Sequence, residues 1–544
     1  MFLPSRIIIL LGCLFLLCGS SNSLFAGKKS SARPNILFFL TDDHRFDVMG
    51  CAGHPIVQTP TMDKLAKNGV RFRNAFVTTS ICAASRASIL TSMYERTHRF
   101  TFGTPPIRSD YVGVSYPMLL KLAGYRTGFI GKFGVSMAQQ GQKKVFDFFR
   151  PVNRNPYFRK DKAGKLRWIE DIAGDHAVEF LQTCKKDQPW CLSISFNASH
   201  AEDRDKKNHY PYPESVGELY KDRKMPEPRL GDEKIFKSQP KFLRESMNRD
   251  RFFWRWDTKE KYQKNVRNYF RMLSGVDNVM ARVLAEVENQ GFADNTIVIF
   301  CGDNGYYLAN RGFAGKWSHY EDSLRIPMII FDPRLPPAQR GREVDDIALN
   351  VDVPATMLDY AGIKRSKLHQ GHSLRPIVEG KKVDNWRTDF FCEHLMENRS
   401  IPKWEGVRGE RWVYARYFGQ KPAFEFLHDL KTDPDQLKNL AGKEKYAEQL
   451  NIMRKRCDAL RDSYGGPYKP HPKKKKKANP KKKAQPNSLT SSSFSATISA
   501  MATSAVSDAN IIAHRTLIAW QRKACASPVF TFPAECALHP EPAS

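Results

Sequence analysis

Four short apolar runs, each followed at once by a polar cluster, constrain the fold of this chain more than any other feature. The runs occupy residues 36–40, 127–130, 192–196 and 296–300. They are rich in β-branched and aromatic residues, which is typical of strands buried on both faces of a parallel sheet. Helical patterns lie between them, at residues 62–67, 116–122 and 269–289. Strands that alternate with helices predict right-handed βαβ units and an α/β fold with a large, mostly parallel sheet flanked by helices.

The polar clusters predict a site at one edge of this sheet. They occupy residues 41–44, 131–134, 197–200 and 301–305. Any one of them alone is typical of a solvated loop. Because open parallel sheets bind ligands beyond the carboxyl ends of their strands, four such clusters at the same edge favour an active site.

Two of these clusters supply candidate metal ligands. They are Asp42 and Asp43 after the first run and Asp303 and Asn304 after the fourth. Four oxygen donors without a cluster of imidazoles or thiolates suit Ca²⁺ or Mg²⁺ rather than zinc. Adjacent carboxylates would raise one another's pKa unless a cation lay between them. The alternative is two surface loops that hold no metal.

The segment at residues 80–93 supplies a candidate nucleophile. Cys82 precedes a helical pattern that begins near Ala84, so its side chain is expected at a helix N-terminus, where backbone N–H groups favour an anion. Arg86, one turn later, adds a planar donor suited to a tetrahedral oxyanion. As an unmodified residue, Cys82 is either a thiolate nucleophile with a low pKa or a small buried residue.

The same segment resembles the signature of the type I sulfatases, Cys-x-Pro/Ala-x-Arg, in the form Cys82-Ala83-Ala84-Ser85-Arg86. Residues 33–37 with Asp42-Asp43, 59–65 and 69–72 are similar to the amino-terminal block of that family. Gly302-Asp303-Asn304-Gly305, followed by Lys316 and Glu321, resembles its second metal block. Residues 428–434 and 439–441 resemble its carboxyl-terminal motif. The similarity runs in order from about Arg33 to Tyr464.

The resemblance implies an alkaline-phosphatase-like α/β fold and a sulfuric ester hydrolase. It implies that a formylglycine-generating enzyme converts Cys82 to formylglycine, whose hydrated form attacks sulfur, becomes sulfated and later expels sulfate. It also implies one Ca²⁺, ahead of Mg²⁺, and no further cofactor. The implied metal ligands are Asp42, Asp43, Cys82, Asp303 and Asn304. The implied catalytic residues are Cys82, Arg86, Lys132, His200 and Lys316, with His200 as the acid that protonates the leaving group.

The sequence departs from the family at one position. Many sulfatases carry Gly-Lys-x-His after the second strand, whereas this chain has Gly134 in place of the histidine. The sequence therefore does not identify the residue that acts as the base during sulfate release. His44 and His319 are candidate substitutes, although a structural or rim-forming role is favoured for both.

The chain divides into four predicted parts. They are a signal peptide at residues 1–26, a sulfatase catalytic domain at 33–365, a smaller α+β subdomain at 366–466 and a disordered Lys/Pro- and Ser/Ala-rich tail at 467–544. The subdomain is expected to contain antiparallel strands at 412–417 and 425–428 and a helix at 446–464. A charged insertion at 201–262 is expected to form the substrate rim. Its aromatic run at 252–256 is either a core anchor, which is favoured, or a sugar-stacking platform.

The net charge and the predicted leader limit the kinds of partner that this chain is expected to have. The 544 residues carry a net charge of +29; the stretch from Gly466 to the end holds twelve basic and three acidic residues, a net of +9, which leaves +20 on the rest. Such a body attracts anions. The apolar run of the leader is too short to span a bilayer, so export to the periplasm or outside the cell is expected, without a transmembrane segment or lipid anchor. Export disfavours nucleic acid as a partner and favours a sulfated glycan.

Removing the leader leaves nine of the 11 cysteines, an odd number, and their pairing is open.

Two other functions remain open on the same residues. One is hydrolysis of a phosphonate or phosphodiester on the same scaffold. The other is binding of sulfated glycan without catalysis, with Cys82 unmodified. The substrate sugar and the choice between O- and N-sulfate are not fixed by the sequence.

Overall fold

The central sheet is built around β1 (Asn35–Thr41), whose seven residues are all buried. A computed structural model describes residues 33–471. In it β1 pairs in parallel with β8 (Trp190–Ser195) on one side and with β9 (Thr296–Gly302) on the other. β4 (Arg126–Gly131) pairs in parallel with β8. The four predicted strands are therefore confirmed, and their carboxyl ends meet at one edge of the sheet.

Four further strands complete a sheet of eight, in the order β11-β2-β10-β9-β1-β8-β4-β5. They are β2 (Val70–Phe72), β5 (Phe148–Pro151), β10 (Met328–Phe331) and β11 (Arg342–Val344). β10 runs antiparallel to both β9 and β2, and the other pairings are parallel. The sheet is mostly parallel, as predicted.

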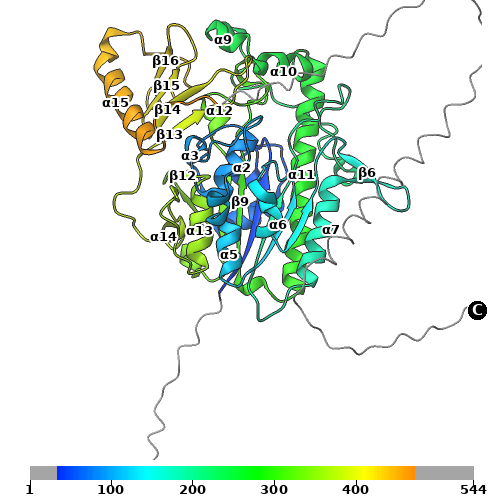
Figure 1. Cartoon of the computed structure of the whole chain (residues 1–544). Helices are drawn as coiled ribbons and strands as arrows, with labels where there is room; N and C mark the ends of the chain where they lie inside the picture. Colours follow the sequence, from blue (N-terminus) through cyan, green and yellow to red (C-terminus); the bar gives the residue numbers. More distant parts are fainter. Residues whose placement is uncertain (1–32, 472–544) are drawn as a thin grey trace, which may run out of the picture. The chain divides into compact units, whose positions relative to one another are not determined.

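Helices cover both faces of this sheet (Figure 1). The alternation along β1 sends Phe38 into one apolar core and Phe39 into another. The first core contains residues of α5 (Tyr116–Leu122) and α13 (Asp352–Tyr360). The second contains residues of three other helices, namely α1 (Pro60–Asn68), α7 (Ile169–Gln182) and α11 (Lys259–Asn289). All three predicted helices are present.

The helix α11 is longer than the sequence pattern indicated. It begins at Lys259 rather than at residue 269, because the Thr258 side chain accepts a hydrogen bond from the Lys261 backbone N–H and caps the first turn. The pattern underestimated the helix because its first turns are rich in charged residues.

A separate antiparallel sheet of four strands lies in the C-terminal part of the described chain and is drawn in yellow in Figure 1. Its strands are β13 (Asp389–His394), β14 (Trp404–Gly409), β15 (Trp412–Tyr417) and β16 (Phe424–Asp429). The helix α15 (Ala447–Ser463) follows. The two predicted strands and the helix are confirmed.

β13 and β14 were not predicted from the sequence because their buried positions include charged side chains. Arg96 contacts Glu393 at 2.9 Å and Glu405 at 2.7 Å, and Arg408 contacts Glu321 at 3.0 Å. Buried ion pairs of this kind remove the alternation of apolar and polar residues that identifies a strand.

The described residues include seven cysteines but neither the predicted leader nor most of the predicted tail. The predicted signal peptide lies outside the described residues, as does the tail from residue 472 onward. Within residues 33–471 the seven cysteines are free thiols. No helix in that range has the length and apolar character needed to cross a membrane.

Candidate active site

Cys82 is the first residue of the helix α2 (Cys82–Thr91), two residues earlier than expected. Ile81 precedes it in an extended conformation, and all ten residues of the helix are buried. Only 5% of Cys82 is exposed. A helix that begins at a buried residue directs unpaired backbone N–H groups toward that residue, so the position favours negative charge.

The four candidate oxygen donors meet beyond the ends of β1 and β9. The backbone N–H of Asp43 lies 3.4 Å from Oδ1 of Asp303, and Nδ2 of Asn304 donates to Oδ1 of Asp43 at 2.7 Å. All four side chains are buried, including that of Asp42. Two loops that are 260 residues apart in the sequence meet because their strands are neighbours in the sheet.

Three cations surround these oxygens. Nε of Arg86 lies 2.8 Å from Oδ2 of Asp303, and its Nη2 lies 4.0 Å from Oδ2 of Asp42. Lys132 contacts Asp42, and Lys316 contacts Asp43. Burial alone would raise the pKa of Asp42, but Lys132, Lys316 and Arg86 outweigh it and hold this pKa below its ordinary value.

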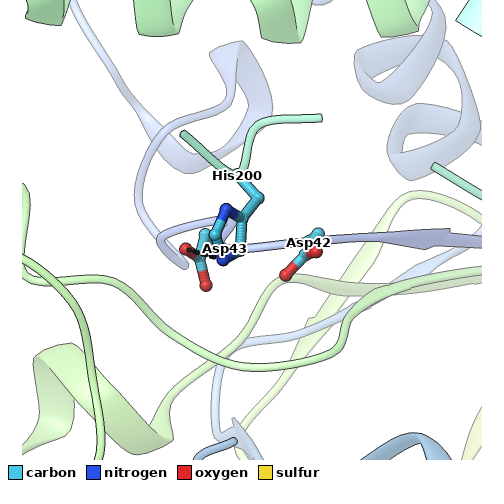
Figure 2. A group of neighbouring side chains, drawn as sticks. All are labelled: Asp42, Asp43 and His200. Atoms are coloured by element: carbon cyan, nitrogen blue, oxygen red, sulfur yellow. Dashed lines mark ion pairs between the residues drawn. The ribbon is translucent and has the colours of Figure 1, made fainter. Parts of the chain in front are cut away.

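His200 completes the group. Its Nε2 lies 3.7 Å from Oδ2 of Asp43, and its Nδ1 lies 2.8 Å from the Ala201 carbonyl oxygen. Figure 2 shows the imidazole next to the Asp43 carboxylate, with Asp42 beside them. An imidazole thus lies beside the oxygen donors, at the edge of the sheet where the cluster at residues 197–200 was predicted. Burial, together with Arg154 and Lys316, lowers the pKa of His200 well below its ordinary value.

The donor set fits a hard divalent cation. Oδ1 of Asp42, Oδ2 of Asp43 and Oδ1 of Asn304 are buried and have no hydrogen-bond partner among residues 33–471. Burial, followed by the charge of Asp42, raises the pKa of Asp303 to about 6. Buried oxygens without donors are costly, and a cation among them would remove that cost.

A pocket of about 310 Å³ opens onto this group. Four of the predicted catalytic residues line it: Cys82, Lys132, His200 and Lys316. Its walls also carry two cations that the sequence analysis did not single out, Arg154 and Arg251, and six apolar residues, Ile81, Phe102, Met247, Trp317, Met396 and Ile401. The structure therefore brings every predicted site residue to one place, either on the pocket wall or in contact with the carboxylates behind it.

The charged insertion contributes to this pocket through α10 (Met247–Arg255). Met247 and Arg251 are one helical turn apart and both line the pocket. The aromatic run of the insertion has two parts. Trp256 is buried, as expected of an anchor, whereas Phe253 and Trp254 are 50% and 45% exposed.

The two candidate substitutes for the missing histidine lie outside the pocket wall. The His44 ring contacts the Thr41 hydroxyl at 3.1 Å and the Val48 carbonyl at 3.0 Å. The His319 ring lies 3.0 Å from the Tyr417 hydroxyl and 3.2 Å from His428. Both rings are buried and held at both nitrogens, so their roles are structural.

The backbone conformation at Gly134 explains why this chain has a glycine where many sulfatases have the histidine. Its φ of +68° is in the left-handed region, and a Cβ added there would lie 3.2 Å from Cδ of Arg86. A side chain at this position would therefore strain the backbone and crowd a residue of the site.

We expect Gly134→Ala to lower the free energy of unfolding by about 1–2 kcal/mol because of the left-handed backbone, and to lower the activity of the site by displacing Arg86. Gly124→Ala is the matched control, because Gly124 has a φ of +89° with nothing within 4 Å of the added Cβ. Chemical denaturation and kinetics of both variants separate backbone strain from crowding. Equal activity in the two variants would contradict the crowding argument.

Comparison with known proteins identifies the family. Residues 34–363 match the sulfatase family model, and residues 309–463 match the model described as the C-terminal part of N-sulphoglucosamine sulphohydrolase. A curated relative from Bacteroides thetaiotaomicron, named N-acetylglucosamine-6-O-sulfatase, is 27% identical over 80% of this chain and 88% of its own length.

Solved structures agree with this result. A protein in complex with its substrate D-glucosamine-2-N,6-O-disulfate superposes with a TM-score of 0.67 and 25% identity, over 79% of this chain and 98% of the other. A phosphonate monoester hydrolase from Silicibacter pomeroyi has a TM-score of 0.65 at 22% identity, over 79% of this chain and 96% of the other, and shares the fold. The order of the motifs, the geometry of the pocket and the match of the family model over most of the described residues lead to one conclusion: the chain belongs to the sulfatase family.

Proposed function

We propose that this sulfatase releases inorganic sulfate from a sulfated glycan, using Cys82 in its formylglycine form and one Ca²⁺. The observation that carries the proposal is the pocket itself. It places residue 82 at a helix N-terminus among three cations, His200 and buried oxygens that have no hydrogen-bond donor among the described residues.

The Ca²⁺ would be held by Asp42, Asp43, Asp303, Asn304 and the modified residue 82. Bound there, it would supply positive charge to the sulfate oxygens and to the nucleophile. The preference for Ca²⁺ over Mg²⁺ rests on the number of carboxylate and amide oxygens that the ends of two neighbouring strands contribute. Conversion of Cys82 would supply a hydrated aldehyde, whose second hydroxyl could expel sulfate by collapse to the aldehyde, a step that a serine or cysteine side chain could not perform.

The cations of the chain hold the sulfate group. Burial would lower the pKa of Lys316, but Asp43 outweighs it and raises this pKa above the ordinary value, so the ammonium group stays charged. The pKa of Arg86 is likewise raised by Asp303 against burial. Fixed charges of this kind, turned toward the oxygens of a sulfate ester, stabilise the charge that develops during transfer.

His200 is placed to protonate the leaving group. Its Nδ1 is held at the Ala201 carbonyl, which leaves Nε2 facing the pocket. Burial, together with the surrounding cations, lowers the pKa of the ring and favours its neutral form. A bound sulfate ester brings negative charge next to the ring and raises its proton affinity, so the acid is formed where it is needed.

We expect His200→Ala to lower kcat/KM for a sugar sulfate by about a hundredfold or more, because an alkoxide is a poor leaving group without a proton. The loss on 4-nitrophenyl sulfate is expected to be much smaller, because nitrophenolate leaves without protonation. Steady-state kinetics on both substrates provide the measurement, with His176→Ala, a partly exposed histidine on α7, as the control. Equal losses on the two substrates would contradict an acid role.

The substrate class follows from charge and from the relatives. The chain outside its last residues carries a large excess of basic side chains, which favours a polyanionic glycan over a neutral aryl ester. Two of the proteins named above, the N-acetylglucosamine-6-O-sulfatase and the protein in complex with D-glucosamine-2-N,6-O-disulfate, act on or bind sulfated amino sugars. We propose a sulfated sugar of this kind and export of the protein, with residues 1–26 as the leader.

The test is release of inorganic sulfate by protein co-expressed with a formylglycine-generating enzyme. The panel contains sulfated amino sugars, sulfated oligosaccharides and, as the rival class, a phosphodiester and a phosphonate monoester. Cleavage of sulfated sugars with the highest kcat/KM supports the proposal. Preference for the phosphorus esters would assign the other reaction, and binding of sulfated glycan without turnover by converted protein would assign a binding role.

A further inference from the structure

We propose that Arg154 and Arg251 form a second anion-binding subsite in the same pocket. It takes a carboxylate or a further sulfate group carried by the substrate next to the sulfate ester that is cleaved. This inference rests on the proposed function and names the substrate class more closely.

Both arginines are fixed to segments that carry the site. Arg154 follows β5, and its backbone N–H donates to Oδ1 of Asn197 at 2.9 Å, in the loop that leads to His200. The guanidinium of Arg251 lies 4.9 Å from the centre of the Trp317 ring, next to Lys316 in the chain. Residues from three distant parts of the sequence thus place two cations on one wall of the pocket.

The charge around these arginines is unbalanced. Arg154, Arg251 and Arg255 all form ion pairs with the same carboxylate, Asp203. Arg255 is fully buried and also donates to the Tyr306 hydroxyl at 2.9 Å, so its role is structural. Three guanidinium groups on one carboxylate leave a net excess of two positive charges, and a bound anion would offset it.

The bonds to Asp203 also leave donors unused. The distances from Asp203 to Arg154 and Arg251 are 3.5 Å and 3.4 Å, longer than the roughly 2.7–2.9 Å of a strong charge-assisted bond. Nε of both arginines is buried without a hydrogen-bond partner among residues 33–471. Nε of Arg255 is also buried without a partner among these residues, but Arg255 does not line the pocket. Arg154 and Arg251 do line it, so their unused donors are the ones that a ligand in the pocket could engage.

The subsite would lie beside the position of the cleaved sulfate, in the same pocket. Among the described residues, neither Arg154 nor Arg251 forms an ion pair with Asp42, Asp43 or Asp303, which are held by Arg86 and the two lysines. Apolar side chains, including Phe102, Trp317 and Met396, line the same pocket and suit the face of a sugar ring. A ring held there would present one substituent to residue 82 and another to the arginine pair.

The test compares pairs of substrates that differ in one anionic group. One pair is glucosamine 6-sulfate and glucosamine 2,6-disulfate; the other is a sulfated disaccharide with its uronate either free or reduced to the alcohol. The wild type is expected to prefer the more highly charged member of at least one pair, and the pair that shows the preference identifies the second group as sulfate or carboxylate. The preference is expected to weaken as salt is added.

Arg251→Ala and Arg154→Ala are each expected to reduce this preference by about tenfold to a hundredfold, because a charge-assisted bond is lost. Arg251→Lys is expected to retain part of it, since the charge remains and the planar fork is lost. The control is Arg244→Ala, an exposed arginine in the same insertion. Thermal unfolding of each variant shows whether it folds. If either alanine variant does not fold, the preference measured for Arg251→Lys tests the subsite instead.

The outcomes separate this inference from the proposed function. If the wild type cleaves both members of each pair equally well, or if the preference is unchanged in the arginine variants, the subsite is wrong while the sulfatase activity stands. If converted wild-type protein releases sulfate from no member of the panel, the proposed function fails and the subsite fails with it.

Discussion

Replacing Cys82 with alanine is expected to abolish sulfate release, with a loss of at least about a thousandfold in kcat/KM. The side chain lies at the start of α2, on the pocket wall, and is the group that the proposal converts to formylglycine. Without it, the cations and His200 still bind the sulfate group but have no nucleophile to assist. Colorimetric or chromatographic detection of released sulfate measures the effect.

Two further variants control for folding and for chemistry. Cys457→Ala removes another buried thiol, in α15, and is expected to retain full activity. Cys82→Ser tests whether a hydroxyl at this place is enough; without a hydrated aldehyde it is expected to be nearly as inactive as the alanine variant. If Cys82→Ala retained substantial turnover, the assignment of the nucleophile would be wrong.

Removal of the metal is expected to have the second largest effect. Asp42→Asn removes one negative charge from the donor set while preserving the shape of the side chain, and we expect a loss of about a hundredfold or more in kcat/KM. Chelation of the wild type is expected to have a similar effect, reversed by Ca²⁺. The reason is that three buried oxygens have no donor among the described residues, and the positive charge next to the sulfate group would be lost.

Thermal unfolding gives a second measurement that does not depend on turnover. At a free Ca²⁺ concentration of about a hundred times the dissociation constant, binding raises Tm of a chain of this size by about 3 °C. The increase is expected in the wild type and in Asp187→Asn, an exposed control, and to be reduced or absent in Asp42→Asn. An unchanged Tm in the wild type with and without Ca²⁺ would contradict the proposed metal site.

The sequence predicted those parts of the fold and site that depend on local pattern. The strands β1, β4, β8 and β9 are continuous apolar runs, so both their existence and their parallel arrangement could be inferred. Asp42 and Asp303 could be placed together because residues that follow neighbouring parallel strands share one edge of the sheet. The order of the motifs along the chain then matched one family.

Other features depend on contacts that no local pattern records. β14 was missed because its buried Glu405 and Arg408 are balanced by arginine and glutamate residues from distant segments. Arg154 was missed because its chain neighbours form no motif, and only the fold brings it onto the pocket wall beside Arg251. The charged insertion was expected at the rim, but which of its many cations would line the pocket could not be inferred without α10.

The missing histidine illustrates the same limit. The motif showed that Gly134 replaces it, and the candidates His44 and His319 were named on sequence alone. The structure places both rings in hydrogen-bonded positions away from the pocket wall. The left-handed backbone at Gly134, next to Arg86, gives the position a physical reason that the motif could not provide.

The most direct test of the account is the mass of the peptide that contains residue 82, taken from protein produced with a formylglycine-generating enzyme and active on a sulfated sugar. This peptide is expected to carry the aldehyde of formylglycine, and turnover is expected to rise in proportion to the converted fraction. An unmodified thiol at residue 82 in fully active protein would contradict this expectation.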